Sequence, residues 1–234
     1  MIDTHCHLIP GVDDGPRDET EAVELARRLV ADGIDSVLCT PHYAHLFPYP
    51  HERAVEGHAS LVAALESERI PLRTTLAAEV HPALAVSEPL EELRRRSIGG
   101  RYLLVEVLPD SPGPFFASAM DRLADAGLVP IFGHPERSRT VQRHIGALDA
   151  ARKAGALVQV VAPSLLGRWG DDARTAAWRL VDTGRADLLA SDAHGIRRRR
   201  PHLREAAQLV AERLSQSVVT ELTERRPALV LEGA

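Results

Sequence analysis

Two histidines near the start of the chain, His5 and His7, have the residue type and the spacing to bind one metal ion. They lie in residues 2–8, a short apolar stretch that is typical of a β-strand. Because side chains alternate across a strand, both imidazoles project from one face near its C-terminal end. Imidazole is a common ligand of transition metals, and the next loop adds the carboxylates Asp13 and Asp14. One His-x-His pair among eleven histidines can arise by chance, so further ligands have to come from the rest of the chain.

Short apolar runs alternate with amphipathic stretches along the chain, which is typical of β/α units with parallel strands. Asp18, with Glu21 three residues later, predicts a capping box for the first helix, and Gly33 ends that helix. The expected strands are residues 2–8, 35–40, 76–81, 102–108, 129–137, 157–161 and 188–194. The expected helices are residues 18–32, 52–68, 88–96, 114–126, 142–154, 173–182, 201–214 and 218–225. These elements predict an α/β barrel slightly short of the eightfold form, in one domain spanning residues 1–234.

Side chains that can bind metals recur at the ends of six expected strands. They are His5 with His7, His42, Glu79, Glu106, His134, and Asp192 with His194. The C-terminal ends of barrel strands converge on one face, where barrel enzymes have their active sites. Glu106 lies within the apolar run Leu-Leu-Val-Glu-Val-Leu, where an unpaired carboxylate would be costly to bury. The pattern predicts a metal centre, whereas His45, His51, His58, His81, His144 and His202 fall in loops or helices and are expected at the surface.

Composition narrows the class of protein. A net charge of −5 argues weakly against a nucleic-acid-binding surface, and no apolar run reaches the ~18 residues of a membrane span. The first residues lack the basic and apolar regions of a signal peptide. The two cysteines, Cys6 and Cys39, are too few for a disulfide framework and lie in expected strands. We therefore expect reduced cysteines and a cytoplasmic protein.

These motifs together resemble the PHP (polymerase and histidinol phosphatase) superfamily. The likeness is greatest to the bacterial manganese-dependent protein-tyrosine phosphatases of capsule and exopolysaccharide loci. It covers nearly the whole chain and rests on Ile2-Asp-x-His-x-His, Val12-Asp-Asp-Gly-Pro16, Thr40-Pro-His42, Ala78-Glu79, Val105-Glu106, Gly133-His-Pro-Glu-Arg137 and Ala190-Ser-Asp-x-His194.

The resemblance implies a distorted (β/α)7 barrel with three divalent transition metals, Mn by preference, with Fe, Zn or Co as alternatives. The implied ligand sets are His5, His7, Glu79 and Asp192 for one metal; Glu79, Glu106 and His134 for a second; and Asp14, His42 and His194 for a third. It also implies two arginines that bind the substrate phosphate, Arg137 and one of Arg197–Arg200, with Arg199 best placed. The sequence leaves open whether Asp13 or Asp14 is the ligand.

The implied activity is hydrolysis of phosphotyrosine by a water that the metals activate. The implied substrate is a phosphotyrosine protein, with a bacterial tyrosine kinase of polysaccharide synthesis as one candidate. A histidinol-phosphate phosphatase or another small-molecule phosphatase of this superfamily is the main alternative. The sequence predicts no nucleic-acid partner and leaves the oligomeric state open.

Other classes of protein fit less well. Cysteine-based tyrosine phosphatases need an arginine six residues after the nucleophile, but Val12 and His45 occupy those positions after Cys6 and Cys39. Amidohydrolases often use a carbamylated lysine at a strand end, and Lys153, the one lysine of the chain, lies late in an expected helix. A TatD-like nuclease shares the opening motif but not the Asp13-Asp14-Gly15 loop, and a non-catalytic metal-binding module is the alternative outside the enzymes.

Overall fold

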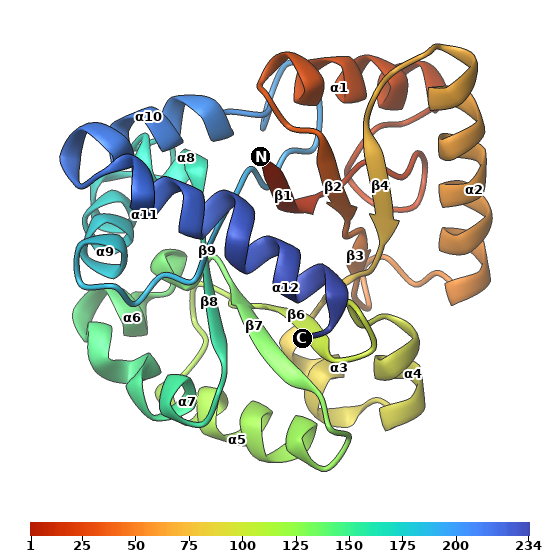
Figure 1. The fold of residues 1–234 in the computed structure, drawn as a ribbon. Helices are drawn as coiled ribbons and strands as arrows, with labels where there is room; N and C mark the ends of the chain where they lie inside the picture. Colours follow the sequence, from red (N-terminus) through yellow and green to blue (C-terminus); the bar gives the residue numbers. More distant parts are fainter.

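Parallel strands form the centre of the protein, seen here in a computed structural model that describes residues 1–234 (Figure 1). One sheet has the order β1-β2-β4 and the other β3-β5-β6-β7-β8-β9, and every pairing within them is parallel. The strands are β1 (Ile2–Cys6), β2 (Ser36–Cys39), β3 (His42–Tyr43), β4 (Arg73–Leu76), β5 (Glu79–Val80), β6 (Tyr102–Glu106), β7 (Val129–Gly133), β8 (Leu157–Val161) and β9 (Leu188–Ala190).

Seven of the nine strands lie within the seven that the sequence predicts, whereas β3 follows the end of the predicted strand 35–40 and β4 begins at Arg73, before the predicted strand 76–81. Short breaks separate β2 from β3 and β4 from β5, and hydrogen bonds continue across them, from the Ala77 amide to Cys39 O (2.9 Å) and from the Glu79 amide to Pro41 O (3.1 Å). β1 lies beside the end of β9, because the Asp192 amide donates to His5 O at 2.9 Å. The result is the barrel-like parallel α/β arrangement expected from the sequence.

Helices surround the strands (Figure 1). They are α1 (Glu19–Ala31), α2 (His51–Ser67), α3 (Pro82–Ser87), α4 (Leu90–Arg95), α5 (Gly113–Ala124), η1 (Pro135–Arg137), α6 (Arg139–Arg143), η2 (Ile145–Leu148), α7 (Asp149–Lys153), α8 (Ala162–Leu165), α9 (Asp171–Asp182), α10 (Leu203–Arg213), α11 (Gln216–Thr220), the π-helical η3 (Glu221–Arg225) and α12 (Arg226–Glu232). None of them combines the length and the hydropathy that a helix crossing a bilayer needs.

The structure corrects several predicted helices. Residues 142–154 do not form one helix, because His144 is extended (φ −140°, ψ 91°) and separates α6 from η2 and α7. α3 was not predicted, although Pro82 at its first position is typical of a helix start. At α1 the capping box is half formed. The Asp18 carboxylate accepts from the Glu21 amide at 3.0 Å, but the Glu21 carboxylate pairs with Arg17.

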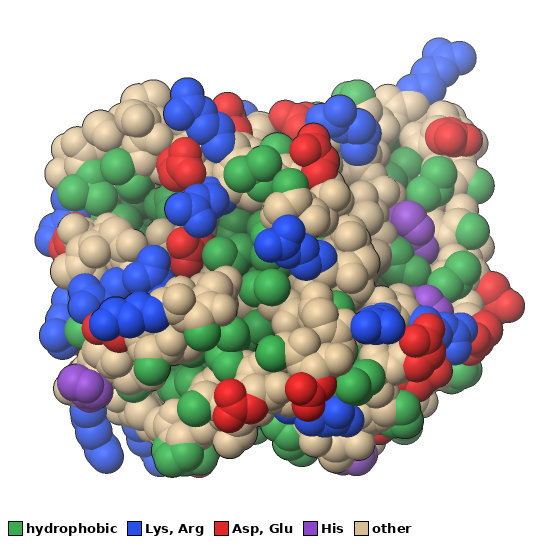
Figure 2. All heavy atoms as spheres, turned by 60° about the horizontal axis from the view of Figure 1, so that its bottom comes forward, with side chains coloured by type: hydrophobic (Ala, Val, Ile, Leu, Met, Phe, Trp, Pro, Cys, Tyr) green, Lys and Arg blue, Asp and Glu red, His purple; other side chains and the backbone are tan.

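The C-terminal helices close one end of the barrel and leave the other for the site. η3 and α12 cross the end where the strands begin; they contact β1 and pass in front of β9 in Figure 1. Val230 of α12 packs in one apolar cluster with Leu188 and Tyr102, the first residues of β9 and β6. The C-terminal ends of the strands therefore lie on the face away from these helices. On the face shown in Figure 2, basic and acidic side chains are interspersed.

The packing of α5 on the sheet gives a stability prediction. Phe116, 1% exposed, meets Phe132 of β7 edge-on at a ring-centroid distance of 5.0 Å. Phe116→Ala should lower the free energy of unfolding by about 3–5 kcal/mol, because it removes buried apolar surface and leaves a cavity. Urea denaturation followed by circular dichroism at a fixed metal concentration measures this. Val55→Ala, at a position 44% exposed on α2, is the control and should change stability by about 0.5 kcal/mol or less. Equal costs for both would contradict this packing.

Candidate metal centre

All nine residues expected to bind metals come together at the C-terminal ends of the strands. They form four overlapping groups, in each of which the ligand atoms lie within 4.8 Å of one another. The groups are His7, Asp14, His42 and His194; His5, Glu79 and His134; His5, His7 and Asp192; and His42, Glu79 and Glu106. These groups differ from the implied sets in their membership. Glu106 groups with His42 and Glu79 and not with His134, while His5 joins Glu79 and His134, and His7 joins Asp14, His42 and His194.

β1 places His5 and His7 at the centre of the site. Both side chains are fully buried, and their Nε2 atoms lie 3.2 Å apart. Glu79 Oε2 is 3.4 Å from His5 Nε2 and 3.5 Å from His7 Nε2, and Asp192 Oδ1 is 3.5 and 3.8 Å from the same two atoms. Two buried carboxylates thus face the same pair of imidazoles.

Glu79 contacts more of the histidines than any other carboxylate here. Its Oε1 lies 2.8 Å from His134 Nε2, and its Oε2 lies 2.9 Å from His42 Nδ1. Since its two oxygens face different imidazoles, this carboxylate has the geometry to bridge two ions. Glu106, at the end of β6, is partly buried beside it. Burial and the neighbouring charge of Glu79 raise the pKa of Glu106 to about 7.

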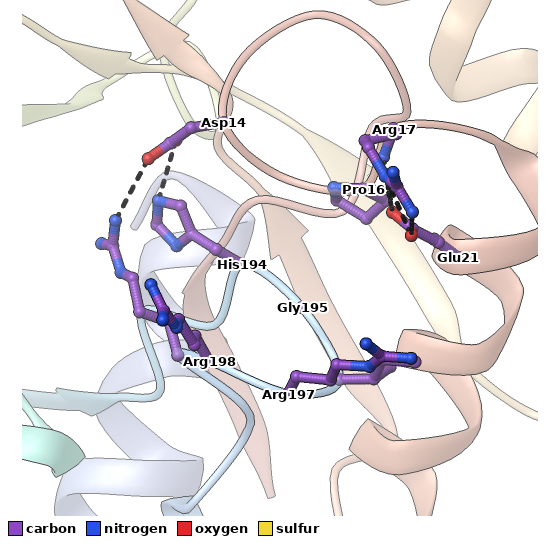
Figure 3. Close-up of a pocket in the computed structure, with 10 residues that line it drawn as sticks. Asp14, Pro16, Arg17, Glu21, His194, Gly195, Arg197 and Arg198 are labelled. Atoms are coloured by element: carbon purple, nitrogen blue, oxygen red, sulfur yellow. Dashed lines mark hydrogen bonds and ion pairs between the residues drawn. The ribbon is translucent and has the colours of Figure 1, made fainter.

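The loop after β1 separates the roles of Asp13 and Asp14. Asp14 Oδ1 lies 3.2 Å from His194 Nε2 and 3.5 Å from His42 Nε2 (Figure 3). Asp13 instead accepts from His7 Nδ1 at 2.6 Å and from the His42 amide at 2.9 Å. The geometry favours Asp14 as the ligand and Asp13 as the residue that orients His7.

A buried glutamine orients His5, the histidine within β1. Gln159, in the middle of β8, donates through Nε2 to Thr4 Oγ1 (2.9 Å), so its Oε1 is the atom that accepts from His5 Nδ1 (2.8 Å). With Nδ1 as donor, His5 presents the lone pair of Nε2 to the centre. Sequence reasoning missed Gln159, although a polar residue inside the apolar run Leu-Val-Gln-Val-Val was an available signal.

The centre has the properties expected of a metal site. His5 and His7 both use Nδ1 as a donor, so two Nε2 lone pairs face each other at 3.2 Å, which is unfavourable without a cation or proton between them. His134 Nδ1 is buried and makes no hydrogen bond, and Glu79 Oε2 and His194 Nε2 are buried beside His42 and Asp14 without the geometry of a hydrogen bond. Buried polar atoms are normally satisfied, and these belong to residue types that bind Mn, Fe, Zn and Co.

The pKa shifts of the histidines also agree with a metal site. Burial opposes the charged form of His5, but the carboxylates of Glu79 and Asp192 outweigh it and raise the pKa of His5 to about 9. At His42 burial is likewise outweighed by Glu79, and the pKa rises to about 9. Burial and the neighbouring His7 lower the pKa of His194 to about 4. Positive charge is therefore favoured at His5 and His42, and a metal there would displace protons.

Two arginines face the same carboxylates. Arg199 Nη2 donates to both oxygens of Asp192, at 2.8 and 2.9 Å, and its Nη1 lies 3.4 Å from Asp14 Oδ2. Arg137 follows His134 in η1, and its Nη1 lies 3.8 Å from Asp192 Oδ2. Within residues 197–200, Arg199 is the one arginine that has a carboxylate partner.

A cavity of about 410 Å³ opens beside the centre (Figure 3). Asp14 and His194 line it on the side of the metal ligands, and Arg197 and Arg198 line it from the loop after β9. Arg17 also borders it, paired with Glu21. This cavity gives a substrate access to the candidate ligands Asp14 and His194.

The remaining histidines belong to none of the four groups. His45 and His144 are exposed, as predicted, whereas His51, His58, His81 and His202 are partly buried. His202 is only 11% exposed and lies 3.1 Å from Glu205, so a fully surface position was the wrong expectation there.

Metal content tests the centre directly. Protein purified without chelator should contain more than one transition metal per chain, and His5→Ala or Asp192→Ala should reduce that content. Glu79→Gln should reduce it most, because its two oxygens face different histidines. Elemental analysis by mass spectrometry measures the effect, and circular dichroism checks folding. His144→Ala, at an exposed position outside the centre, should keep the full content. Full metal content in Glu79→Gln would contradict the assignment.

Comparison with known proteins agrees with the motifs. Residues 1–232 match the family model for capsular polysaccharide synthesis, CpsB/CapC. The tyrosine-protein phosphatase YwqE of Bacillus subtilis is 30% identical over 98% of this chain and 91% of its own length. The putative tyrosine-protein phosphatase CapC of Staphylococcus aureus is 30% identical over 85% of this chain and 79% of its own.

A solved structure shares the whole fold. It comes from work on YwqE and on CpsB from Streptococcus pneumoniae, described as unique metal-dependent tyrosine phosphatases. It superposes with a TM-score of 0.89 at 30% identity and covers 100% of this chain and 95% of the other. The histidinol phosphate phosphatase of Lactococcus lactis, at 10% identity and a TM-score of 0.51, shares the fold alone. The likeness expected from the motifs is confirmed, and the chain belongs to the CpsB/CapC family of capsular polysaccharide synthesis.

Proposed function

We propose that this protein is a metal-dependent protein-tyrosine phosphatase and that residues 1–234 act as one catalytic domain. The observation that carries the proposal is the buried cluster of imidazoles and carboxylates around Glu79, with Arg137 and Arg199 facing it. Relatives with this fold are named tyrosine-protein phosphatases and described as metal-dependent. Metal ligands beside guanidinium groups suit the hydrolysis of a phosphate monoester.

Three divalent metals, Mn by preference, are proposed as the cofactors. His5, His7, Glu79 and Asp192 would hold one; Glu79, Glu106 and His134 a second; and Asp14, His42 and His194 a third. The short distances from Glu79 to His5, His42 and His134 support its role as a shared ligand. Such ions supply an activated water for attack on phosphorus and polarise the phosphoryl oxygens.

The arginines bind and orient the phosphoryl group. Arginine cannot act as a metal ligand, but its planar fork matches two phosphate oxygens. Arg199 Nη2 contacts both oxygens of the Asp192 carboxylate, so its guanidinium group lies within reach of the centre. Arg137 lies against Trp169, whose ring centroid is 4.4 Å from the guanidinium carbon. Both groups would neutralise the charge that is shared by the phosphoryl oxygens during transfer.

A separate proton donor is less critical for an aryl phosphate, because its leaving group is a weak base. A tyrosyl oxygen leaves as a phenolate with a pKa of about 10, far below that of an alkoxide.

A cysteine mechanism is not supported. Cys6 and Cys39 are fully buried, and burial raises the pKa of both thiols. The polysaccharide context of the family suggests a bacterial tyrosine kinase as the physiological substrate.

Relative turnover on a substrate panel tests this activity. Phosphotyrosine peptide should be hydrolysed with a higher kcat/KM than histidinol phosphate, a phosphodiester or single-stranded DNA, because phenolate leaves easily and the site binds a terminal phosphoryl group. Released phosphate measures the first two substrates, and product chromatography measures the others. Chelation should abolish turnover, while thiol alkylation should leave it intact. A preference for histidinol phosphate or DNA would contradict the proposed substrate class.

Arginine variants separate substrate binding from metal assembly. Arg137→Ala should lower kcat/KM on phosphotyrosine by about one to two orders of magnitude, because one charge-assisted contact is lost. Arg137→Lys should recover only part of this, since the fork is absent. Metal content should not change in either variant. The matched control is Arg139→Ala, two residues on, which pairs with the exposed Asp110 and should retain activity.

The kcat/KM on phosphotyrosine should also be measured for variants in which each arginine of residues 197–200 is changed to Ala separately. Arg199→Ala should have the largest effect, because Arg199 alone in this run contacts carboxylates of the centre. Four equal and small effects would show that the run acts only through its general charge.

A further inference from the structure

A second cavity, of about 290 Å³, lies on the other side of the arginine run. The residues that line it are Pro163, Arg168, Trp169, Arg197, Arg198, Arg199, Arg200 and His202. It contains five arginines and no carboxylate. Arg199 lines both this cavity and the one that opens at the metal centre, so the two are neighbours.

The positive charge of this cavity is largely uncompensated. Arg197, Arg198 and Arg200 have no carboxylate oxygen within 4.0 Å, and Arg168 has only the exposed Glu205, at 3.5 Å. Elsewhere arginines of this acidic chain are commonly paired, such as those of the pairs Arg17–Glu21 and Arg213–Asp182. An unpaired group of arginines in a concave site attracts anions.

The loop after β9 is folded so that Arg197, Arg198 and Arg199 border both cavities, whereas Arg200 borders the second alone. The His194 amide donates to Arg199 O at 2.8 Å, and Arg199 adopts a left-handed conformation with φ 49°. Figure 3 shows Arg197 and Arg198 projecting from this loop beside the first cavity. The run is therefore held in a defined shape and is not simply an extended basic segment.

Trp169 adds an aromatic wall. Its side chain is 37% exposed, and the guanidinium carbons of Arg137 and Arg199 lie 4.4 and 5.8 Å from its ring centroid. An exposed indole between arginines offers a flat apolar surface to another ring, while the guanidinium groups bind the charge that ring carries. Phosphotyrosine has both parts, whereas a glutamate side chain has only the charge.

We infer that the cavity lined by Trp169 and Arg168 binds a second phosphotyrosine of the same substrate chain. The inference rests on the proposed phosphatase activity and goes beyond it, because it names a second binding site and a class of substrate. One phosphotyrosine occupies the metal centre while its neighbour binds here, so a multiply phosphorylated segment is held at two points. Binding at two points lowers KM and leaves kcat nearly unchanged.

Matched peptides test the inference on the metal-loaded enzyme. The first has one phosphotyrosine with Tyr two to four residues away on either side; in the second and third, that Tyr is replaced by phosphotyrosine or by Glu. The doubly phosphorylated peptide should show a kcat/KM about tenfold higher than the first, beyond the twofold expected from having two reactive groups. The Glu peptide should gain about threefold or less, since a carboxylate lacks the ring and one charge.

Arginine variants then test whether the preference for the doubly phosphorylated peptide arises at this cavity. The double variant Arg168→Gln/Arg200→Gln should lose the tenfold preference and keep its kcat/KM on the singly phosphorylated peptide within about twofold. The control Arg179→Gln/Arg225→Gln removes the same charge from arginines that line neither cavity and have no carboxylate partner, and should keep the preference.

Three results would overturn the inference: only the statistical twofold preference in the unaltered enzyme, equal gains from Glu and phosphotyrosine, or equal losses in both double variants. The last two would indicate general charge attraction. Failure of the enzyme to release phosphate from any of the peptides would overturn the proposed phosphatase function, and this inference with it.

Discussion

Two imidazole nitrogens that face each other at 3.2 Å define the centre of this protein. Neither His5 nor His7 can turn away, because Gln159 and Asp13 hold their Nδ1 atoms. Two lone pairs at this distance require positive charge between them, and the buried carboxylate of Glu79 nearby requires the same. One cation would satisfy all of these groups at once, whereas without positive charge the buried carboxylate and lone pairs would be uncompensated.

Helices η3 and α12 cover the end of the barrel where the strands begin, so the C-terminal ends of the strands are left for the site. Strands β1, β5, β7 and β9 end in or just before the ligands, so the positions of those side chains follow from the register of the sheet. The Asp3 carboxylate accepts from the amide and hydroxyl of Ser191, which ties β1 to the end of β9. Asp192 and His194 are therefore fixed relative to His5 by the join between the first and last strands.

The sequence predicted the parts of this structure that depend on local pattern. Apolar runs marked the strands, and polar residues at their ends marked eight of the nine side chains that the structure brings together. The ninth, Asp14, lies in the loop after the first strand, where the sequence left the choice between Asp13 and Asp14 open. It did not predict the breaks between β2 and β3 or the extended His144, because both depend on tertiary packing. Gln159 was missed because its role appears only when the strands fold together and bring its side chain to Thr4 and His5. Trp169 was missed because Arg137 and Arg199, which lie near its ring, are distant from it in the sequence.

Backbone conformation adds a final constraint on the site. Four non-glycine residues have positive φ, and three of them are His134, Asp192 and Arg199. The left-handed region costs an ordinary residue about 1 kcal/mol or more, so such residues persist only where the surroundings determine them. Here His134 and Asp192 turn the chain just after β7 and β9, and Arg199 turns it in the loop that follows β9. All three side chains are directed toward the same group of carboxylates and imidazoles. A glycine at these positions would relieve the strain but would remove the side chain that the turn presents. The strain is thus a consequence of gathering three charged or ligating groups from two strand ends around one small volume.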